Sequence, residues 1–553
     1  MQSRARVLAW LVGCAAILLA APPMCLAADV LVICPAEFRA ALGPWLAHRR
    51  GQGHKVDVAT TVESPEHVRA AIRAKALAGD LRHVLLVGDA PAALVAGFAP
   101  RGAALPVAKI AARVTLRYGS EAEIATDNWY ADLDDDGVPD LAIGRITADT
   151  PSELKTIVGK VLAYERNVDF GHWRRRINIV AGAGGFGTVI DGALEMWARR
   201  LITDGVPAAY STSLVYSSVS SPYCPDPRGI RPAALASLSE GCLFWVYMGH
   251  GRHDRVNAPG EEPGVLFSSD MPRLAATHGA PIALFLSCYA GAFDGQEDCL
   301  AEEMLRAPGA PIAILCGSRV TMPYAMAVLG REMLVATFQA RPPTLGEAVL
   351  EAKRAMAAAD RGDPSRKALD EAAAALGPSG EDLAAERLEH LALFNLIGDP
   401  LIRIPRPRDL QLDVIQTAVV GDRLTVRGES DVQGRCTVEL VVCRDRLAFK
   451  PPPRDDDSRS PASLAEFQDT HRRANDQRLA WAETDARKGV FQTSLTIPPE
   501  ARGRCHVRVF IEGESDCAAG AADIIILRRR PRPAAGSALR GVHKTAPGPS
   551  VRE

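Results

Sequence analysis

Short apolar segments alternate with amphipathic segments along the first part of the chain. Val30–Ile33 and His83–Val87 are apolar runs of strand length, and a third strand is expected at 55–58. Between them, apolar positions recur at helical spacing over 35–50 and 66–78. Strands that alternate with helices are typical of a parallel sheet covered by helices. The pattern therefore predicts an α/β fold.

The same alternation repeats after a helix that begins at Thr150 and Pro151, where a capping hydroxyl and a first-turn proline come together. This helix closes an N-terminal subdomain, 29–170, and a second subdomain follows at 171–405. The strands and the helix expected in the second subdomain are strands at 177–180, 211–216, 243–248, 281–286 and 311–315 and a helix at 193–202.

Beyond residue 405 the apolar pattern changes to period two. Short alternating strands separated by turn residues are typical of a small β-sandwich, which we place at 406–528. A polar stretch at 450–488 is expected to be an insertion that forms a solvated loop with a short helix. The tail, 529–553, is rich in Pro, Gly and Arg and is predicted to be disordered.

Two of the expected strands lead into residues with reactive side chains. The run 243–248 leads into Gly249, His250 and Gly251, and the run 281–286 leads into Ser287 and Cys288. Ligands of open α/β sheets bind just beyond the carboxyl ends of the strands. A thiol becomes a nucleophile as the thiolate, and a neighbouring imidazole is a common base for it. The alternative is a buried cysteine beside a glycine-rich turn.

These strand ends resemble those of the gingipain family of caspase-like cysteine peptidases, in which His-Gly and Cys end adjacent strands. Leu85–Asp89, the helix that contains Ser152–Asn167, and Phe394–Pro400 resemble further family segments in the same order. The resemblance covers roughly residues 29 to 405. It implies a caspase-like parallel sheet as the catalytic domain, so 171–405 becomes the catalytic subdomain, and an immunoglobulin-like β-sandwich after it.

The resemblance also gives roles to the residues at the strand ends. Cys288 is the expected nucleophile and His250 the general base. Gly251 has no side chain, so its N–H can approach a substrate and form an oxyanion hole with the N–H of Cys288, as in the family. The acid that orients His250 stays open between Asp254, Asp127 and Asp191.

Asp191 is also a candidate for the substrate pocket. Arg-specific gingipains place an acid in their primary pocket from the segment that corresponds to residues 181–191 here. Asp191 would then receive an Arg or Lys side chain in a charge-assisted pair. The alternative is an acid in the first turn of a helix, where the helix dipole favours it.

An acidic loop resembles the beginning of a calcium-binding loop. Carboxylates occupy its positions 1, 3, 5 and 9, glycine occupies position 6, and a backbone carbonyl at position 7 supplies a further oxygen. The twelfth position, Ile143, cannot supply a bidentate carboxylate. A structural Ca²⁺ is expected, and the alternative is a solvated acidic turn. The expected ligands are Asp132, Asp134, Asp136, Val138 and Asp140.

Composition and the N-terminus restrict the setting of this chemistry. The chain has 553 residues, with 64 Lys and Arg against 66 Asp and Glu. It therefore lacks the excess of basic residues that is typical of nucleic-acid-binding proteins. Residues 1–28 have the basic start, apolar stretch and small-residue end of a signal peptide. No later segment is long and apolar enough to span a membrane.

Export permits disulfides, and four C-terminal cysteines could pair among themselves: Cys436, Cys443, Cys505 and Cys517.

The combined expectation is a secreted cysteine endopeptidase that cleaves proteins or peptides through a thioester acyl-enzyme. It would act in the periplasm, at the cell surface or outside the cell, without an organic cofactor. Two alternatives remain open, a catalytically silent surface or binding protein on the same scaffold and a thiol transpeptidase. The sequence leaves the oligomeric state open.

Overall fold

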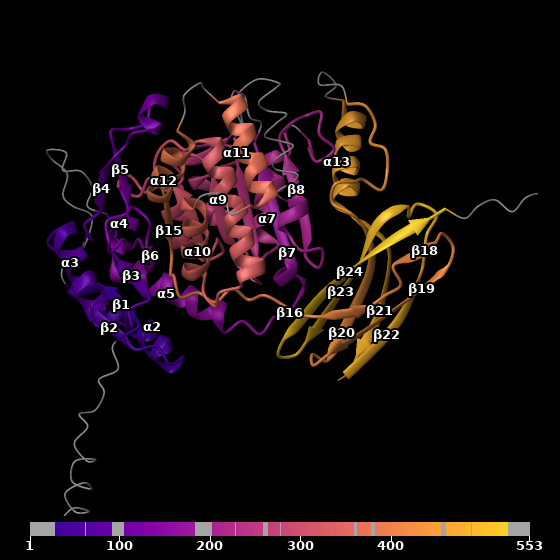
Figure 1. Cartoon of the computed structure of the whole chain (residues 1–553), viewed down its shortest axis with the longest axis horizontal. Coiled ribbons are helices and arrows are strands. Elements are labelled where there is room, and N and C mark those ends of the chain that lie inside the picture. The colour runs from indigo at the N-terminus through magenta and orange to yellow at the C-terminus, as the bar shows by residue number, and fades with distance from the viewer. Residues whose placement is uncertain are drawn as a thin grey trace, which may run out of the picture.

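The computed structural model describes residues 28–60, 62–90, 104–182, 202–226, 228–257, 264–276, 278–358, 362–377, 382–454, 460–487 and 489–528. Figure 1 shows an α/β body, coloured indigo to orange, followed by a separate β-rich part in orange and yellow. Asp191, the tail 529–553 and all of the expected signal peptide except residue 28 lie outside the described residues.

A ten-stranded sheet runs through the whole α/β body in the order β2-β1-β3-β6-β15-β14-β13-β9-β7-β8. Neighbouring strands are parallel except for β14 and β15, which are antiparallel. The predicted α/β fold with a large parallel sheet is confirmed. The strands are β1 Val30–Ile33, β2 Val56–Ala59, β3 His83–Val87, β6 Ala142–Ile146, β7 Arg176–Ala181, β8 Ser211–Tyr216, β9 Phe244–Met248, β13 Ile282–Leu286, β14 Ala313–Gly317 and β15 Phe394–Ile397.

Helices cover this sheet, and several begin at capping residues visible in the sequence. The Thr150 side chain accepts from the Glu153 N–H at the start of α5, and Thr344 and Glu347 form a capping box at α10. The α-helices are α2 Arg39–Gly51, α3 Pro65–Ala76, α4 Asn128–Ala131, α5 Pro151–Glu165, α7 Ile230–Ser239, α8 Leu300–Arg306, α9 Pro323–Val335, α10 Leu345–Ala357, α11 Pro364–Leu376 and α12 Leu383–Leu393.

Short elements complete the body. They are the strands β4 Ala108–Ala111, β5 Glu123–Thr126, β10 His250–Arg252, β11 Arg255–Asn257 and β12 Leu266–Phe267, the 3-10 helices Ala36–Phe38, Thr115–Tyr118, His172–Arg175 and Ser268–Arg273, and the π-helix Ala336–Ala340.

One buried apolar cluster extends from Val30 to Ile404 and therefore spans both predicted subdomains. A buried ion-pair network connects segments from near the start and near the end of this stretch of the chain. Arg49 donates to Asp399 at 2.6 Å and to Glu165 at 2.8 Å, and Asp399 lies two residues after the end of β15. Two of the segments that resemble the family contribute these carboxylates, which here pair with a fully buried guanidinium. Such a network is costly to break, because loss of one partner leaves a buried charge.

The β-rich part consists of two sheets that share one apolar cluster. One sheet has the order β16-β24-β23-β20-β21, with β18 added on β24, and the other has the order β17-β19-β22. Its immunoglobulin-like character stays a prediction. The elements are β16 Arg408–Asp409, β17 Gln411–Asp413, β18 Thr417–Val419, β19 Arg423–Ser430, β20 Gly434–Val442, α13 Pro461–Asn475, β21 Arg478–Ala486, β22 Gly489–Thr496, β23 Gly503–Gly513 and β24 Cys517–Leu527.

The stretch 450–488 differs from the expected solvated loop. It contains the long helix α13 and the strand β21, which pairs with β20 along its length. β21 lies at the end of its sheet, and most of its residues are exposed or half-exposed. Polar side chains are accommodated there, so the apolar alternation that reveals an inner strand is weak.

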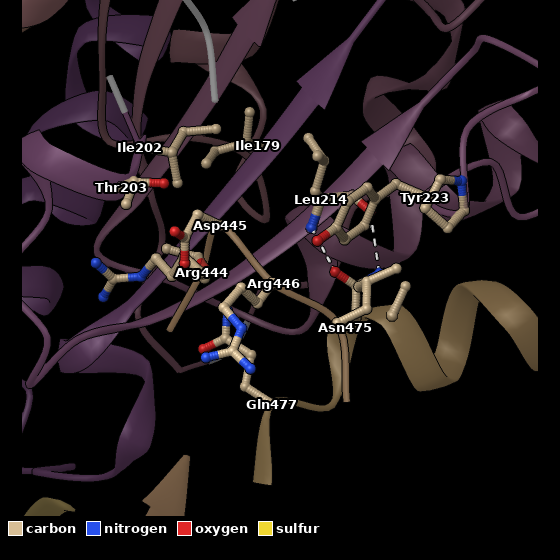
Figure 2. A pocket seen from close by; sticks show the side chains of 14 residues that line it. Ile179, Ile202, Thr203, Leu214, Tyr223, Arg444, Asp445, Arg446, Asn475 and Gln477 are labelled. Carbon is tan, nitrogen blue, oxygen red and sulfur yellow. Dashed lines mark hydrogen bonds between the residues drawn. The ribbon is translucent and has the colours of Figure 1, made fainter. Parts of the chain in front are cut away.

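The two parts of the protein meet along β8, as Figure 2 shows for a pocket at this junction. Asn475 of α13 accepts from the Leu214 N–H at 2.8 Å and donates to the Leu214 carbonyl at 3.0 Å. Its side-chain amide thus pairs with backbone groups of β8, the last strand of the sheet. Nearby, Glu439 of β20 accepts from Arg175 of the body and from Arg508 of β23. These contacts attach the β-rich part to the α/β body.

The cysteines of the β-rich part are unpaired. Cys436, Cys443, Cys505 and Cys517 are all free and buried, so the disulfides that export would permit are not formed. In the part of the chain that the structure describes, no helix combines the length and the apolar character needed to cross a bilayer.

Candidate active site

His250 and Cys288 lie at equivalent positions beyond two paired strands. β9 and β13 are parallel neighbours, with Met248 opposite Leu286 at their carboxyl ends. The Gly249 N–H donates to the Leu286 carbonyl at 3.2 Å, so the pairing continues one residue further. His250 and Cys288 each follow two residues after the last paired residue of their strand. The structure therefore brings the two predicted residues to the same edge of the sheet.

Gly251 lies directly against the turn that carries Cys288. A Cβ atom at this position would collide with the Cys288 carbonyl oxygen and would lie 2.9 Å from Ser287 Oγ. Gly251 belongs to β10, which pairs with β11. The absence of a side chain thus permits a close approach between the segment after β9 and the segment after β13.

The turn at Cys288 is held in an uncommon conformation. Tyr289 has φ of 57°, in the left-handed region, and the Ala290 N–H donates to the Cys288 carbonyl at 2.7 Å. The Tyr289 N–H donates to the Arg319 carbonyl at 3.2 Å, and the Arg319 side chain is paired with Asp294 at 2.7 Å. Strained backbone of this kind persists where surrounding contacts hold it, and it is enriched at functional sites.

The thiol of Cys288 is the accessible one. Every other described cysteine is buried, and Cys288 alone is partly exposed. Burial raises the pKa of Cys34 to about 12 and holds the pKa of Cys299 well above its ordinary value. Thiols of that kind are poor nucleophiles because the thiolate is disfavoured. Cys288 is the cysteine that a substrate or an alkylating agent can reach.

Thr321 contacts the Cys288 sulfur and was not expected from the sequence. Its N–H donates to Sγ at 3.3 Å, and its hydroxyl lies 3.6 Å from the same atom. Thr321 follows β14, which is the neighbour of β13 on the side opposite β9. The sequence predicted a further strand at 311–315. It did not indicate which residue of the loop after this strand would contact the Cys288 sulfur.

His390 supports the loop that contains Thr321. It is fully buried in α12, where its Nε2 accepts from the Met322 N–H at 2.7 Å and its Nδ1–H donates to the Glu386 carbonyl at 2.7 Å. Burial lowers the pKa of His390 to about 4. The neutral imidazole is the form that can accept at Nε2, so protonation would break the bond to Met322.

Acid is therefore expected to weaken the fold through His390. Its pKa is about 4 in the folded protein against 6.5 when unperturbed, so the unfolded chain takes up the proton first as the pH falls. The free energy of unfolding should decrease between pH 6.5 and about 4, with His390 accounting for up to about 3 kcal/mol. Denaturant unfolding over this range should show a shallower pH dependence for His390→Gln. Parallel pH profiles for the two proteins would contradict this origin.

The candidates for the acid beside His250 have different surroundings. Both carboxylate oxygens of Asp127 accept from Arg145, at 2.7 and 2.8 Å, in a buried ion pair. Asp254 lies in the turn between β10 and β11, with its Oδ1 3.4 Å from Arg255 Nε. Asp191 lies outside the described residues. Asp127 is thus committed to Arg145, and the orienting acid stays a prediction.

The acidic loop brings together three of its expected ligands. Carboxylate oxygens of Asp132, Asp134 and Asp136 lie within 4.8 Å of one another. Asp140 instead accepts from the Leu133 N–H at 2.8 Å, and Val138 donates its N–H to Asp136 at 2.7 Å. The calcium site stays a prediction.

Removal of Ca²⁺ is expected to lower the melting temperature if this loop binds it. A cation bound only by the folded state stabilises it by mass action, by about 2.7 kcal/mol at a hundred times its dissociation constant. Thermal melts with chelator and with excess Ca²⁺ measure the effect, and Asp134→Ala should reduce the shift. If Ca²⁺ shifts the melting temperature of Asp134→Ala as much as that of the native protein, the loop is a solvated turn and not a calcium site.

Comparisons with known proteins agree with this architecture. The crystal structure of the Arg-specific cysteine proteinase gingipain R superimposes with a TM-score of 0.51 at 15% identity, over 90% of this chain and 98% of that chain. Lys-gingipain of Porphyromonas gingivalis is 24% identical over 288 residues, which are 50% of this chain and 15% of the relative. Gingipain R2 of the same organism is 23% identical over 298 residues, 52% of this chain and 36% of the relative. The chain spans well under half the length of these two relatives.

The fold is that of the gingipain type of cysteine peptidase. A family model described as peptidase family C25 matches residues 26–405, which is more than half of the chain. The chain belongs to peptidase family C25, and the predicted resemblance to the gingipain family is confirmed.

Proposed function

We propose that the protein is a cysteine endopeptidase in which Cys288 and His250 form the catalytic dyad. His250 takes the thiol proton as the Cys288 sulfur attacks the peptide carbonyl, and a tetrahedral intermediate forms. The C–N bond then breaks, the amine leaves with the proton from His250, and a thioester remains on Cys288. Water, activated by the same imidazole, hydrolyses the thioester and restores the thiol.

The observation that carries this proposal is the register of β9 and β13. His250 and the partly exposed Cys288 each lie two residues beyond the last paired residue of adjacent parallel strands. Thr321 supports the position of the Cys288 sulfur, because its N–H, its hydroxyl and its carbonyl all contact this atom. Membership of peptidase family C25 is consistent with this chemistry.

Gly251 and Cys288 are proposed to supply the oxyanion hole with their backbone N–H groups. Support comes from the close approach of Gly251 to the Cys288 turn, which sets the two backbone segments side by side. Donors fixed in this way stabilise the negative charge of the tetrahedral intermediate more than that of the ground state.

The proposed substrates are proteins or peptides with a basic residue before the scissile bond. Support comes from the relatives, one of which is named Lys-gingipain and another of which is described as Arg specific. We retain Asp191 as the candidate partner of the basic side chain. Cleavage of a peptide library by the purified protein tests the proposal, since a peptidase yields defined fragments and a silent scaffold yields none.

Asp191→Ala is expected to remove the preference for basic residues while some cleavage of neutral peptides remains. A pocket carboxylate without a cationic guest is poorly compensated, so it selects for Arg or Lys. Library cleavage by the variant and by the native protein measures this preference. An acid that only stabilises a helix start would cost up to about 1 kcal/mol of stability and leave specificity unchanged. A native enzyme without basic preference would refute the pocket and leave the peptidase assignment intact.

Export is part of the proposal and is supported by the N-terminal sequence. Residues 1–28 have the features of a signal peptide, which would place the mature protein in the periplasm, on the cell surface or in the medium. N-terminal sequencing of the secreted protein would test the cleavage near Ala27 or Ala28.

A further inference from the structure

Two arginines face each other across the small sheet that carries His250. β10 and β11 are antiparallel, with Arg252 directly opposite Arg255, and a two-residue turn joins them. The Cβ atoms of residues opposed in this way lie about 5 Å apart. Like charges in such a pair destabilise it, so an anion close to both guanidinium groups would stabilise this end of the hairpin.

The carboxylates nearby do not neutralise this arginine pair. Arg252 is exposed and forms no ion pair with any described residue. Arg255 has its Nε 3.4 Å from Oδ1 of Asp254, and neither of these two buried atoms has a hydrogen-bonding partner among the described residues. Asp270 is already paired with Arg231 at 2.6 Å. The end of the hairpin therefore has an excess of positive charge over the described carboxylates.

The guanidinium of Arg255 is held in place by an aromatic ring. Phe267 of β12 lies opposite Arg255 in the sheet, and the guanidinium carbon is 5.6 Å from the centre of its ring. Arg231 of α7 lies over the same ring at 4.4 Å. A cation–π contact orders an arginine without using its N–H donors. These donors therefore stay available for a carboxylate.

Arg252 and His250 lie on the same face of β10. Residues two apart in a strand point to the same side and are about 7 Å from each other. Gly251, between them, faces the Cys288 turn, and its partner across the pair, Val256, is fully buried. That face is the inner one. The outer face, which is open to solvent, carries the imidazole and the arginine pair together.

The position of the arginine pair indicates which part of a substrate it contacts. In the proposed mechanism His250 protonates the leaving amine, so the residues after the scissile bond must pass close to His250 and β10. An extended peptide advances about 3.4 Å per residue. The arginine pair, two residues along the strand from His250, is thus within reach of the first three residues after the scissile bond.

We propose that Arg252 and Arg255 form a subsite for an Asp or Glu side chain among the first three residues after the scissile bond. This inference rests on the proposed peptidase function and adds a second determinant of specificity, on the other side of the bond from the basic residue. Arginine binds carboxylates through charge-assisted, often bidentate, hydrogen bonds. Arg252 is the more exposed member, so its replacement is the sharper test.

Paired peptide substrates test the subsite. Each pair shares one sequence that the native protein cleaves and carries Glu or Gln at the first, second or third position after the scissile bond. We expect kcat/KM to be about fivefold higher for Glu at one of these positions, as for a favourable exposed ion pair. The advantage should shrink at about 1 M salt, which screens exposed charges. Arg252→Gln should remove it, and Arg252→Glu should make Lys at that position the better substrate.

Arg472→Gln is the matched control, because it removes the same charge from an exposed side chain of α13 and should keep the preference for Glu. Circular dichroism establishes that each variant is folded. Equal kcat/KM for Glu and Gln at all three positions would overturn the subsite and leave the peptidase function standing. An unchanged preference for Glu in both Arg252 variants would also overturn it.

A binding measurement separates the subsite from the proposed peptidase function. Fluorescent peptides that differ only in three consecutive Glu or Gln residues are titrated with Cys288→Ala protein, and fluorescence anisotropy reports the affinity. We expect the Glu peptide to bind at least about fivefold more tightly, and Arg252→Gln in the same background to abolish the difference. Selective binding without any hydrolysis by the native protein would refute the peptidase and keep the acidic-peptide site. Equal affinity, or no binding of either peptide, in a protein that cleaves nothing would overturn both.

Discussion

Replacement of Cys288 by alanine is expected to lower kcat/KM for peptide hydrolysis by about 10⁴-fold or more, with the melting temperature nearly unchanged. The reason is that covalent attack has no other accessible thiol, since all other described cysteines are buried. His250→Ala should cause a similar loss, because without a base the thiol of Cys288 is a poor nucleophile. The double variant should be little worse than either single variant, since two residues that act as a unit lose their effect together.

Initial rates with a cleaved library peptide measure these losses, and Cys443→Ala provides a matched control. Cys443 is a buried cysteine of the β-rich part, so its loss should leave the rate unchanged. Native rates of hydrolysis in Cys288→Ala or His250→Ala would refute the proposed dyad.

Gly251→Ala is expected to be the most damaging substitution outside the proposed dyad, with a fall of about 10²–10³-fold in kcat. The added methyl group would collide with the Cys288 carbonyl oxygen, so either β10 or the Cys288 turn must move. Both changes displace an N–H group that the proposed oxyanion hole requires. Because the damage concerns the transition state, KM should change much less than kcat.

Steady-state kinetics with one peptide substrate separates these two constants. Gly159→Ala in α5 is the control, since a Cβ there meets no atom within 4 Å and the same chemical change should leave kcat intact. Equal kinetics for Gly251→Ala and the native protein would show that this close approach has no part in catalysis.

The strand ends of the sheet could be predicted from the sequence because their signal is local. Apolar runs that end in Gly249-His250 and Ser287-Cys288 identify the edge where parallel strands present their ligands, and pairing of β9 with β13 aligns them. β21 was missed because an outermost strand tolerates polar residues on both faces.

Contacts between distant segments could not be deduced in the same way. Thr321 reaches the sulfur of Cys288 from a loop whose path depends on the packing of His390 beneath it. Asp127 was a candidate to orient His250, but its carboxylate is held by Arg145, and no sequence spacing announces that pair.

The most direct test of the proposed dyad is to trap the acyl-enzyme. The native protein is mixed with an activated peptide ester, quenched in acid within one turnover, and mapped by peptide mass spectrometry. The account predicts that the acyl group is attached to Cys288, and that the amount formed within the same interval falls sharply in His250→Ala. An acyl group on any other residue, or rapid ester hydrolysis with no acylated Cys288, would contradict it.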